Sequence, residues 1–439
     1  MTSSVLERLE GLVSPFGVIA GAHALQARRG LGDVIDGSSA FFGTPVLHLE
    51  DRYSADLKHL REHQWEKAQG FGRAFKDPED ARLKALAEAA ERYSSSDFGE
   101  PVLRSSYQDL GSQALDPGRI PRCSDRELAL PGCPLTSFDP RAQIRWVLGI
   151  DLPSGNEIWI PAVMAYYGLR RAEPAEHFWY RISTGFAIHS DPTEALVRGI
   201  CEVIERDAIA ITWLQKLELP LVADGLLPED VREMISWGHS HFCRYWLFDA
   251  TTDLAVPTVL CLGRAIYASR LAHTLGCSTG LTIGSAAKKA MLEACFTRRC
   301  ELATESPDNL ADFHSISDGA RYMAAPGRWP AFGFLVEDAE DRPALDHPEL
   351  PGRPEATLAT LLATLSGKGM SVIAVDRTTR ELADAGLTAV NVVIPELQPM
   401  TLHPLAQYRL HPRLYSAPGQ MGYPVLPEEE LNSWPIPFE

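Results

Sequence analysis

The strongest constraint on the fold is the stretch 192–213, which has the composition of a long helix that is apolar on nearly all sides. Pro192 suits the first turn of a helix, and Asp191 before it is a typical N-cap residue. A helix that is hydrophobic all round must be covered by other elements. Glu202 and Glu205 nevertheless lie within this stretch. The sequence therefore predicts a central helix that carries acidic groups towards the interior.

The rest of the chain predicts an α+β fold, in which helices cover layered sheets. The expected helices are 78–94, 228–237, 285–302 and 355–366, and the expected strands are 143–150, 157–164, 245–249, 257–262, 332–336 and 370–375. No linker rich in Pro or Ser divides the chain. We therefore expect one large catalytic domain over residues 66–439, entered by an N-terminal segment over residues 1–65 and ending in a proline-rich tail from Pro395 onward.

Composition and charge exclude several classes of protein. The 439 residues include 41 Lys and Arg against 58 Asp and Glu, so the formal charge of −17 disfavours nucleic acid as a partner. No apolar run reaches the roughly 18 residues that a membrane span requires, and the first ten residues lack a secretory signal. The eight cysteines show no zinc-binding spacing. These features predict a cytoplasmic protein without a nucleic-acid or membrane partner.

A repeated motif carries the functional signal. The pattern small-x-x-Glu-x-x-Glu-Arg occurs at residues 85–92 and again at residues 199–206. In each copy the two glutamates project from neighbouring points of one helix face. A single copy on an alanine-rich helix is most often a solvated surface, and this alternative stays open. The second copy lies in an apolar helix, where carboxylates are costly unless a cation or an arginine neutralises them.

Further acidic and basic residues extend this pattern. Glu194 precedes Glu202 by about two helical turns, and the helix at 285–302 adds Glu293 and Arg298. Converging carboxylates bind Mg²⁺, which commonly brings nucleotide phosphates, and arginines contact phosphate oxygens. The chain has no P-loop and no kinase-type glycine loop. Any ATP site in this protein is therefore of an unusual, carboxylate-rich kind.

Beyond these patterns, the chain resembles the YcaO family, and within it the SagD-type azoline-forming cyclodehydratases of ribosomal peptide natural-product biosynthesis. The resemblance extends from about Val13 to the C-terminus, and the order and spacing of its motifs make it specific. The motifs are residues 88–93 (EAAERY), 146–155 (WVLGIDLPSG), 183–187 (STGFA), 202–208 (EVIERDA), 290–298 (AMLEACFTR) and 432–439 (NSWPIPFE).

The resemblance implies a site for ATP and Mg²⁺ that is built by glutamates on two helices. By motif, the expected metal ligands are Glu88, Glu91, Glu202 and Glu205. The expected nucleotide contacts are these four residues together with Ser14, Lys84, Glu194, Arg206 and Arg298. The terminal carboxylate at Glu439 is expected to reach the active site on the proline-rich tail and to assist proton transfer.

The implied activity is ATP-dependent cyclodehydration of Cys, Ser or Thr in a ribosomally made precursor peptide. The side chain attacks the preceding carbonyl, ATP phosphorylates the oxygen of the resulting hemiorthoamide, and loss of phosphate leaves thiazoline or oxazoline. Phosphorylation turns a poor leaving group into a good one. The resemblance also implies a homodimer. A separate partner protein is expected to bind the leader of the precursor, because no leader-binding extension precedes residue 78.

Three departures from the family pattern bear on this activity. Lys84 replaces a small hydroxyl residue, and its amine can contact a phosphate or face water. Phe296 replaces a common Gln, and the usual proline-rich end is altered at residues 435–439. Two alternatives stay open: the same ATP chemistry with another nucleophile, giving a thioamide or an amidine, and a nucleotide-binding scaffold that has lost turnover.

Overall fold

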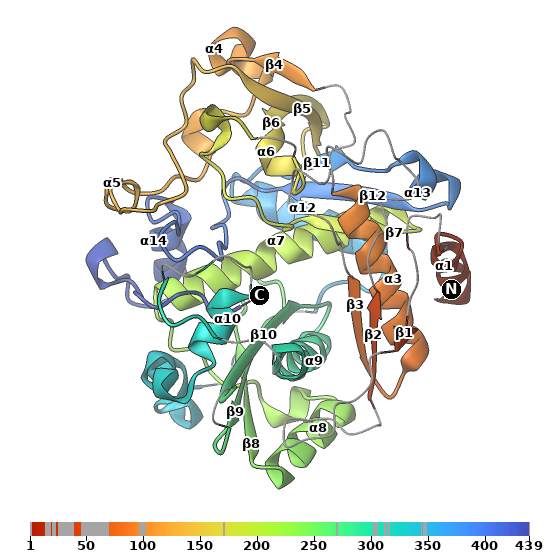
Figure 1. Ribbon diagram of the computed structural model, residues 1–439, viewed down its shortest axis with the longest axis vertical. Helices are drawn as coiled ribbons and strands as arrows, with labels where there is room; N and C mark the ends of the chain where they lie inside the picture. The colour runs from red at the N-terminus through yellow and green to blue at the C-terminus, as the bar shows by residue number, and fades with distance from the viewer. Residues whose placement is uncertain are drawn as a thin grey trace.

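Helix α7 (Pro192–Leu214) crosses the middle of the computed structural model, with sheets on both sides of it (Figure 1). Thirteen of its 23 residues are buried. The Asp191 side chain caps the helix, because its Oδ1 accepts a hydrogen bond from the main-chain N–H of Thr193 (2.9 Å). The predicted central helix and its N-cap are therefore confirmed.

The structure describes residues 2–13, 19, 23–24, 39–44, 70–95, 102–169, 172–268, 271–301, 306–310, 313, 317–343, 345 and 349–438. Ser14, Glu439 and most of the N-terminal segment lie outside these ranges. For Phe296 and Arg298 only the backbone is described. The expectations for Ser14, Arg298 and Glu439, and the division of the chain near residue 65, therefore stay predictions.

The described strands form three antiparallel sheets. Their bounds are β1 (His23–Ala24), β2 (Ser39–Thr44), β3 (Gly70–Phe75), β4 (Leu103–Ser105), β5 (Ile144–Asp151), β6 (Asn156–Pro161), β7 (Phe186–His189), β8 (Cys243–Asp249), β9 (Thr258–Ala265), β10 (His273–Thr279), β11 (Ile373–Asp376) and β12 (Thr388–Val393). The largest sheet has the order β4-β5-β11-β12-β7, with β6 also paired to β5. The other two sheets, β1-β2-β3 and β8-β9-β10, follow chain order.

The helices that accompany α7 are α1 (Thr2–Glu10), α3 (Pro78–Ser94), α4 (Tyr107–Leu110), α5 (Asp125–Leu128), α6 (Ala162–Ala165), α8 (Glu229–Ser240), α9 (Ile283–Glu301), α10 (Asp318–Met323), α11 (Gly333–Val336), α12 (Pro354–Gly367), α13 (Arg380–Asp384) and α14 (Arg413–Gln420). Every helix predicted from the sequence is present, with small differences at the ends. The mixed helix and sheet architecture confirms the predicted α+β class.

Several parts of the secondary structure differ from the sequence prediction. The expected strand at 157–164 is observed only as far as Pro161, because α6 begins at Ala162. The expected strand at 332–336 is wrong, because this region ends a 3-10 helix and forms α11. Phe332 and Leu335 are its fully buried side chains, and a spacing of three residues suits a helical turn. Strands β3, β4, β7 and β12 were not predicted, and neither was β10. Strand β10 is buried at all seven positions, so the alternation that marks a half-buried strand is absent.

Helices α3 and α9 each pack closely onto the last strand of a three-stranded sheet. An added Cβ at Gly72 on β3 would overlap the carbonyl oxygen of Ala81 on α3. An added Cβ at Gly276 on β10 would likewise overlap the carbonyl oxygen of Ala290 on α9. Glycine on the strand and alanine on the helix therefore bring the two backbones together. Side chains that follow on each helix can then reach the main chain of the strand.

The C-terminal tail is anchored on the second half of α7. Ile436 and Phe438 are buried in the same apolar cluster as Trp213 of α7. The indole Nε1 of Trp213 also donates a hydrogen bond to the carbonyl oxygen of Trp434 (2.9 Å). In Figure 1 the C-terminus accordingly lies beside α7 and β10, near the centre of the molecule.

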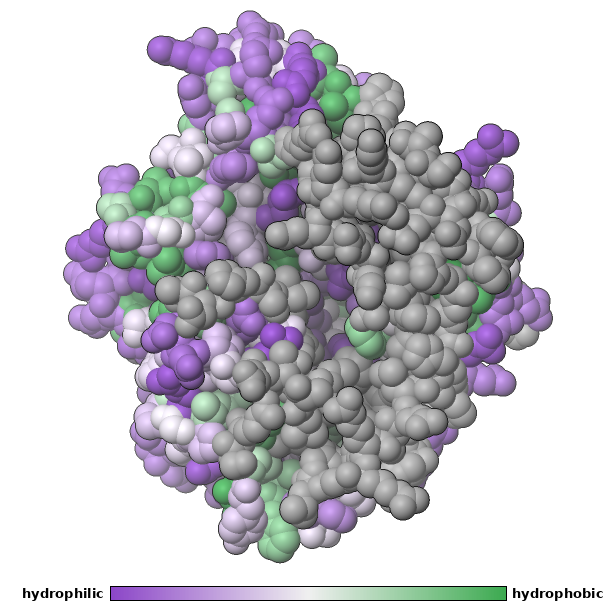
Figure 2. Space-filling model, viewed as in Figure 1, coloured by the Kyte–Doolittle hydropathy of each residue, from purple (hydrophilic) through white to green (hydrophobic). Residues whose placement is uncertain are grey.

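The surface is mainly hydrophilic where side chains are coloured in Figure 2. A hydrophobic patch appears at the lower end of this view, where Figure 1 places the ends of β8 and β9. Phe242 directly precedes β8 and Tyr267 follows β9; both side chains are exposed, and their ring centroids are 5.2 Å apart. Among the described residues, no helix has both the length and the apolar character to cross a bilayer.

Candidate functional site

A cavity of about 420 Å³ lies between helices α3 and α7. Strand β3 and α3 form one side, α7 and the residues around the start of β7 form the other, and Met400 and Leu402 contribute from the segment after β12. The acidic residues that line it are Glu88, Glu91 and Glu202, and the basic residues are Arg73, Lys84, Arg92, Arg198 and Arg206. The structure therefore brings both copies of the repeated motif to one cavity.

Helix α3 presents Glu88 and Glu91 to this cavity. The main-chain N–H of Phe71 on β3 donates a hydrogen bond to Glu88 Oε2 (2.8 Å), and Arg92 Nη2 donates to Glu88 Oε1 (3.2 Å). Burial raises the pKa of Glu91 well above its ordinary value, and the nearby Glu202 carboxylate raises it further. Glu88 is thus fixed at the wall, while Glu91 lacks enough positive charge around it to ionise normally.

Helix α7 presents Glu202 from the opposite side. The main-chain N–H of Gly185 donates to Glu202 Oε2 (3.0 Å), and Arg206 Nη2 donates to Oε1 (3.4 Å). Gly185 has a φ of +86°, and an added Cβ would overlap the carbonyl oxygen of Val392. Only glycine fits here without strain, so the STG motif positions the amide that holds Glu202.

The pKa of Glu202 is also raised, chiefly by burial, although Arg206 and Arg92 lower it. Glu91 and Glu202 therefore line the same cavity from opposite helices, and the Glu202 carboxylate disfavours ionisation of Glu91. A bound cation would remove this penalty, because it stabilises both ionised carboxylates. The charge arrangement fits a cation that arrives with its ligand.

Glu205 lies behind the cavity instead of lining it. Its Oε2 accepts a hydrogen bond from the main-chain N–H of Thr279 at the end of β10 (2.9 Å), and Arg206 Nη1 lies 3.2 Å from its Oε1. Burial raises the pKa of Glu205 to about 7, against the effect of Arg206, and Glu293 adds to the rise. Glu293 itself accepts a hydrogen bond from the main-chain N–H of Cys277 (3.0 Å). Glu205 thus pairs with Arg206 and links α7 to the β8-β9-β10 sheet through its hydrogen bond with Thr279.

Three of the arginines that line the cavity were not predicted: Arg73, Arg92 and Arg198. Arg92 occupies in the first motif copy the place that Arg206 occupies in the second, so the repeat itself held the signal for it. Arg73 comes from β3 and pairs with Glu293 (3.6 Å), and no sequence pattern identified it. The positive charge at the cavity suits phosphate oxygens.

Two residues that were predicted to contact the nucleotide, Lys84 and Glu194, make hydrogen bonds within their own helices. Lys84 lines the cavity, but its Nζ donates to Asp80 Oδ2 (2.6 Å) on the same helix. Glu194 does not line it and instead accepts a hydrogen bond from Arg198 Nε (3.0 Å). Eight residues separate Glu194 from Glu202, which leaves them about 80° apart around the helix. Glu194 therefore reaches the cavity only through Arg198.

The donor set fits a metal that is carried by a nucleotide. Within the described residues, no three Asp, Glu, His or Cys side chains converge to form a complete metal site. Mg²⁺ is commonly held by one or two carboxylates, with substrate phosphates and water completing its shell. Glu88, Glu91 and Glu202 can supply such carboxylates, while the four-glutamate metal set stays a prediction. Met400 and Leu402 of the tail line the cavity, and none of the described residues from His403 to Phe438 does.

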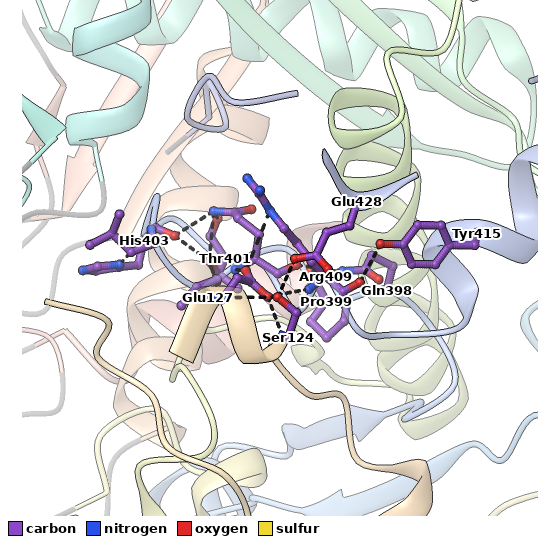
Figure 3. A network of polar contacts seen from close by, with 12 residues as sticks. Ser124, Glu127, Gln398, Pro399, Thr401, His403, Arg409, Tyr415 and Glu428 are labelled. Carbon is purple, nitrogen blue, oxygen red and sulfur yellow. Dashed lines mark hydrogen bonds and ion pairs between the residues drawn. The ribbon is translucent and has the colours of Figure 1, made fainter. Parts of the chain in front are cut away.

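A polar network holds the irregular segment that follows β12 (Figure 3). Glu127 Oε2 accepts a hydrogen bond from the main-chain N–H of Arg409 (2.8 Å) and also from that of Ser124 (2.9 Å). Thr401 Oγ1 donates to the carbonyl oxygen of His403 (3.2 Å). These bonds fix a segment without regular secondary structure against α5, so that Met400 and Leu402 form a defined wall of the cavity.

Comparison with known proteins places this geometry in a family. The model of the YcaO family, described as YcaO cyclodehydratase, ATP- and Mg²⁺-binding, matches residues 71–398. An uncharacterized protein from Methanothermobacter thermautotrophicus is 24% identical over 331 residues, which cover 74% of this chain and 80% of that protein.

Solved structures share the fold. A heterocyclase in complex with substrate and cofactor has a TM-score of 0.81 at 22% identity, covering 100% of this chain and 57% of that one, so our chain spans little more than half its length. YcaO from Methanopyrus kandleri, bound with AMPPCP and Mg²⁺, has a TM-score of 0.61 at 17% identity and 91% coverage of both chains. The E. coli microcin synthetase McbBCD complex with pro-MccB17 bound has a TM-score of 0.58 at 16% identity, covering 85% of this chain and 87% of that one.

Proposed function

The chain belongs to the YcaO family, and from this membership we propose that it is an ATP-dependent cyclodehydratase. Its substrate would be a ribosomally made peptide, and its products thiazoline or oxazoline formed at Cys, Ser or Thr. The observation that carries the proposal is the cavity between α3 and α7, where Glu88, Glu91 and Glu202 face Arg92 and Arg206.

The proposed reaction needs both the arginines and the glutamates of the cavity. A thiol or hydroxyl of the peptide first bonds to the preceding carbonyl carbon. The former carbonyl oxygen must then depart, together with the N–H proton, so that the C=N bond can form. ATP supplies the phosphoryl group that makes this oxygen a leaving group. The arginines would offset the charge on phosphate oxygens, and the glutamates would hold Mg²⁺. The atoms lost from the peptide equal one molecule of water for each ring.

The residues already fixed by main-chain hydrogen bonds give the site its preorganisation. Glu88 is held by Phe71 and Glu202 by Gly185, so neither carboxylate has to be ordered when a nucleotide binds. Glu205 and Arg206 pair on α7, and this contact orients the guanidinium towards the cavity. The proposed proton-transfer role of Glu439 stays a prediction.

We also propose that the protein acts with partners. A separate leader-binding protein would deliver the precursor peptide, and the chain would form a homodimer. The similarity of fold to a substrate-bound heterocyclase and to a multiprotein synthetase bound to its pro-peptide supports a peptide substrate and a partner protein.

The test uses the purified protein with a leader-binding partner and a precursor peptide encoded beside it. We expect ATP-dependent loss of the mass of water from the peptide, and Glu202→Gln should lower this rate more than about tenfold. Glu355→Gln, an exposed residue in the first turn of α12, is the matched control and should keep the wild-type rate. A gain of sulfur in place of oxygen would instead indicate a thioamide. Nucleotide binding without any turnover would indicate a scaffold.

A further inference from the structure

A second, smaller hollow lies beside the nucleotide cavity, between α7, β12 and the segment after β12. Its volume is about 40 Å³. Thr184 and Arg206 line both hollows, so the two adjoin at α7. A cavity needs about 10–15 Å³ to hold one water molecule. The hollow therefore has room for a chemical group of a few atoms, and not for a nucleotide base.

The walls of this hollow are mostly apolar. They include Met164, Trp179, Val203 and Ile394. Arg206 also lines it, but this guanidinium already faces the Glu202 and Glu205 carboxylates at 3.4 and 3.2 Å. A further charged group would lose its hydration without gaining a free counter-ion. The hollow therefore favours an uncharged group.

Three polar atoms of the lining residues are buried without a hydrogen-bond partner in the described part of the chain. They are Thr184 Oγ1, Arg206 Nη1 and Gln398 Oε1. Buried polar groups in folded proteins are nearly always paired, because an unpaired one is costly. A hydroxyl can donate and the amide oxygen can accept. The Arg206 guanidinium can donate as well. Together the three atoms suit a ligand group that carries one acceptor oxygen and one donor, because an oxygen can accept two hydrogen bonds.

The orientation of Gln398 is fixed by its other contacts. Its Nε2 donates to the carbonyl oxygen of Gln407 (3.1 Å), and its main-chain N–H donates to the buried Asp207 Oδ1 (2.7 Å). Turning the amide over would set Oε1 against the carbonyl oxygen of Gln407. Figure 3 shows Gln398 beside Pro399 in the polar network that holds this segment. Gln398 Oε1 is therefore a preset acceptor.

We propose that this hollow binds the reacting amide of the precursor peptide, an inference that rests on the function proposed above. A secondary amide carries one N–H and one carbonyl oxygen, and so has the required donor and acceptor. The N–H donates to Gln398 Oε1, and the Thr184 hydroxyl donates to the carbonyl oxygen. Arg206 lines both hollows, so its guanidinium would stabilise the negative charge that develops on the hemiorthoamide oxygen while that oxygen faces the γ-phosphate.

The hollow also restricts the nucleophile. The tip of a side chain that attacks the bound amide must lie against the mostly apolar walls of the hollow. A lysine amine is charged at neutral pH, since its ordinary pKa is about 10.4, and would have to lose its hydration. The site therefore favours Cys, Ser or Thr over an amine, which supports azoline formation over amidine formation.

The first test is Thr184→Val, which removes the hydroxyl and keeps the shape. Because Thr184 Oγ1 has no partner in the described part of the chain, we expect thermal stability equal to or above that of the wild type. The probe is N-acetylglycylcysteine methylamide, in which the Gly–Cys amide directly precedes the cysteine that carries the thiol, added with saturating Mg·AMPPCP. Saturation-transfer NMR should show about tenfold weaker binding of this probe. The Kd of Mg·AMPPCP should stay within about twofold of wild type.

The second variant is Gln398→Met, which keeps the length and removes the acceptor. We expect the same loss of probe binding with nucleotide binding retained. Gln108→Met, at an exposed position of α4, is the matched control and should bind both ligands like the wild type.

Unchanged probe binding in Thr184→Val and Gln398→Met would show that the hollow holds only water, and the inference would be wrong while the proposed function stands. A parallel loss of Mg·AMPPCP affinity would assign the two atoms to the nucleotide and would also overturn it. If the wild type bound no Mg·AMPPCP, the proposed function itself would fail. These results are distinguishable because the nucleotide and the probe are measured separately.

Discussion

Gly185 offers a sharp test of how the site is built. Its φ of +86° lies in the left-handed region, where a residue with a side chain is disfavoured by about 1–2 kcal/mol. In Gly185→Ala the new Cβ would also overlap the Val392 carbonyl oxygen and lie 3.2 Å from Val203 Cγ2. Overpacking of this kind costs about 1–3 kcal/mol. We therefore expect the free energy of unfolding to fall by about 2–5 kcal/mol.

The matched control is Gly155→Ala in the turn between β5 and β6. Gly155 has a similar φ of +71°, but an added Cβ there would have no atom within 4 Å. The loss should be only the conformational cost of about 1–2 kcal/mol. Urea unfolding followed by tryptophan fluorescence measures both values.

Gly185→Ala should also weaken nucleotide binding, because the Gly185 N–H fixes Glu202 Oε2 at 3.0 Å. Calorimetric titration with Mg·AMPPCP, at urea-free conditions where the variant is folded, measures this effect. The reasoning is refuted if both alanine variants lose the same stability, or if Gly185→Ala binds the nucleotide as tightly as Gly155→Ala.

Three further predictions concern the charged groups. In Glu91→Gln, removing the buried carboxylate beside Glu202 should raise the melting temperature without Mg²⁺ and abolish the additional stabilisation by Mg·AMPPCP, as a thermal shift assay would show. The pKa of Glu205 is raised from 4.5 to about 7, so between these pH values the folded state retains a proton that the unfolded state releases. The free energy of unfolding should therefore fall as the pH rises from 4.5 to about 7. Urea titrations at several pH values measure this slope, which Glu205→Gln should reduce. Arg413→Met leaves Asp207 without the guanidinium that lies 2.8 Å from it, and should lower the free energy of unfolding by about 3–5 kcal/mol in the same assay.

The helices that carry the site could be predicted because their signals are local. Residues 78–94 begin after a capping Asp and are rich in alanine, leucine and glutamate, and α3 has these same bounds. Helix α7 begins at Pro192 as predicted, because the cap and the proline both act within the first turn. The family motifs then identified Glu88, Glu91 and Glu202 as residues of one site, and these three line one cavity.

Other features depend on long-range packing and could not be predicted in this way. Strand β10 has no alternation to reveal it, because helix α9 and α7 bury both of its faces. The positions of Glu205 and Arg73 depend on where β10 and β3 lie relative to the helices. Gln398 enters the second hollow only because the network around Glu127 fixes an irregular segment, and no periodicity marks such a segment.

The most direct measurement of the central claim is the position of Mg·AMPPCP in crystals of this protein. The account predicts electron density for the nucleotide between α3 and α7, with phosphates beside Arg92 and Arg206 and the metal against carboxylates of Glu88, Glu91 or Glu202. A nucleotide bound elsewhere, or a cavity that stays empty at saturating Mg·AMPPCP, would contradict the claim that these helices form the ATP site.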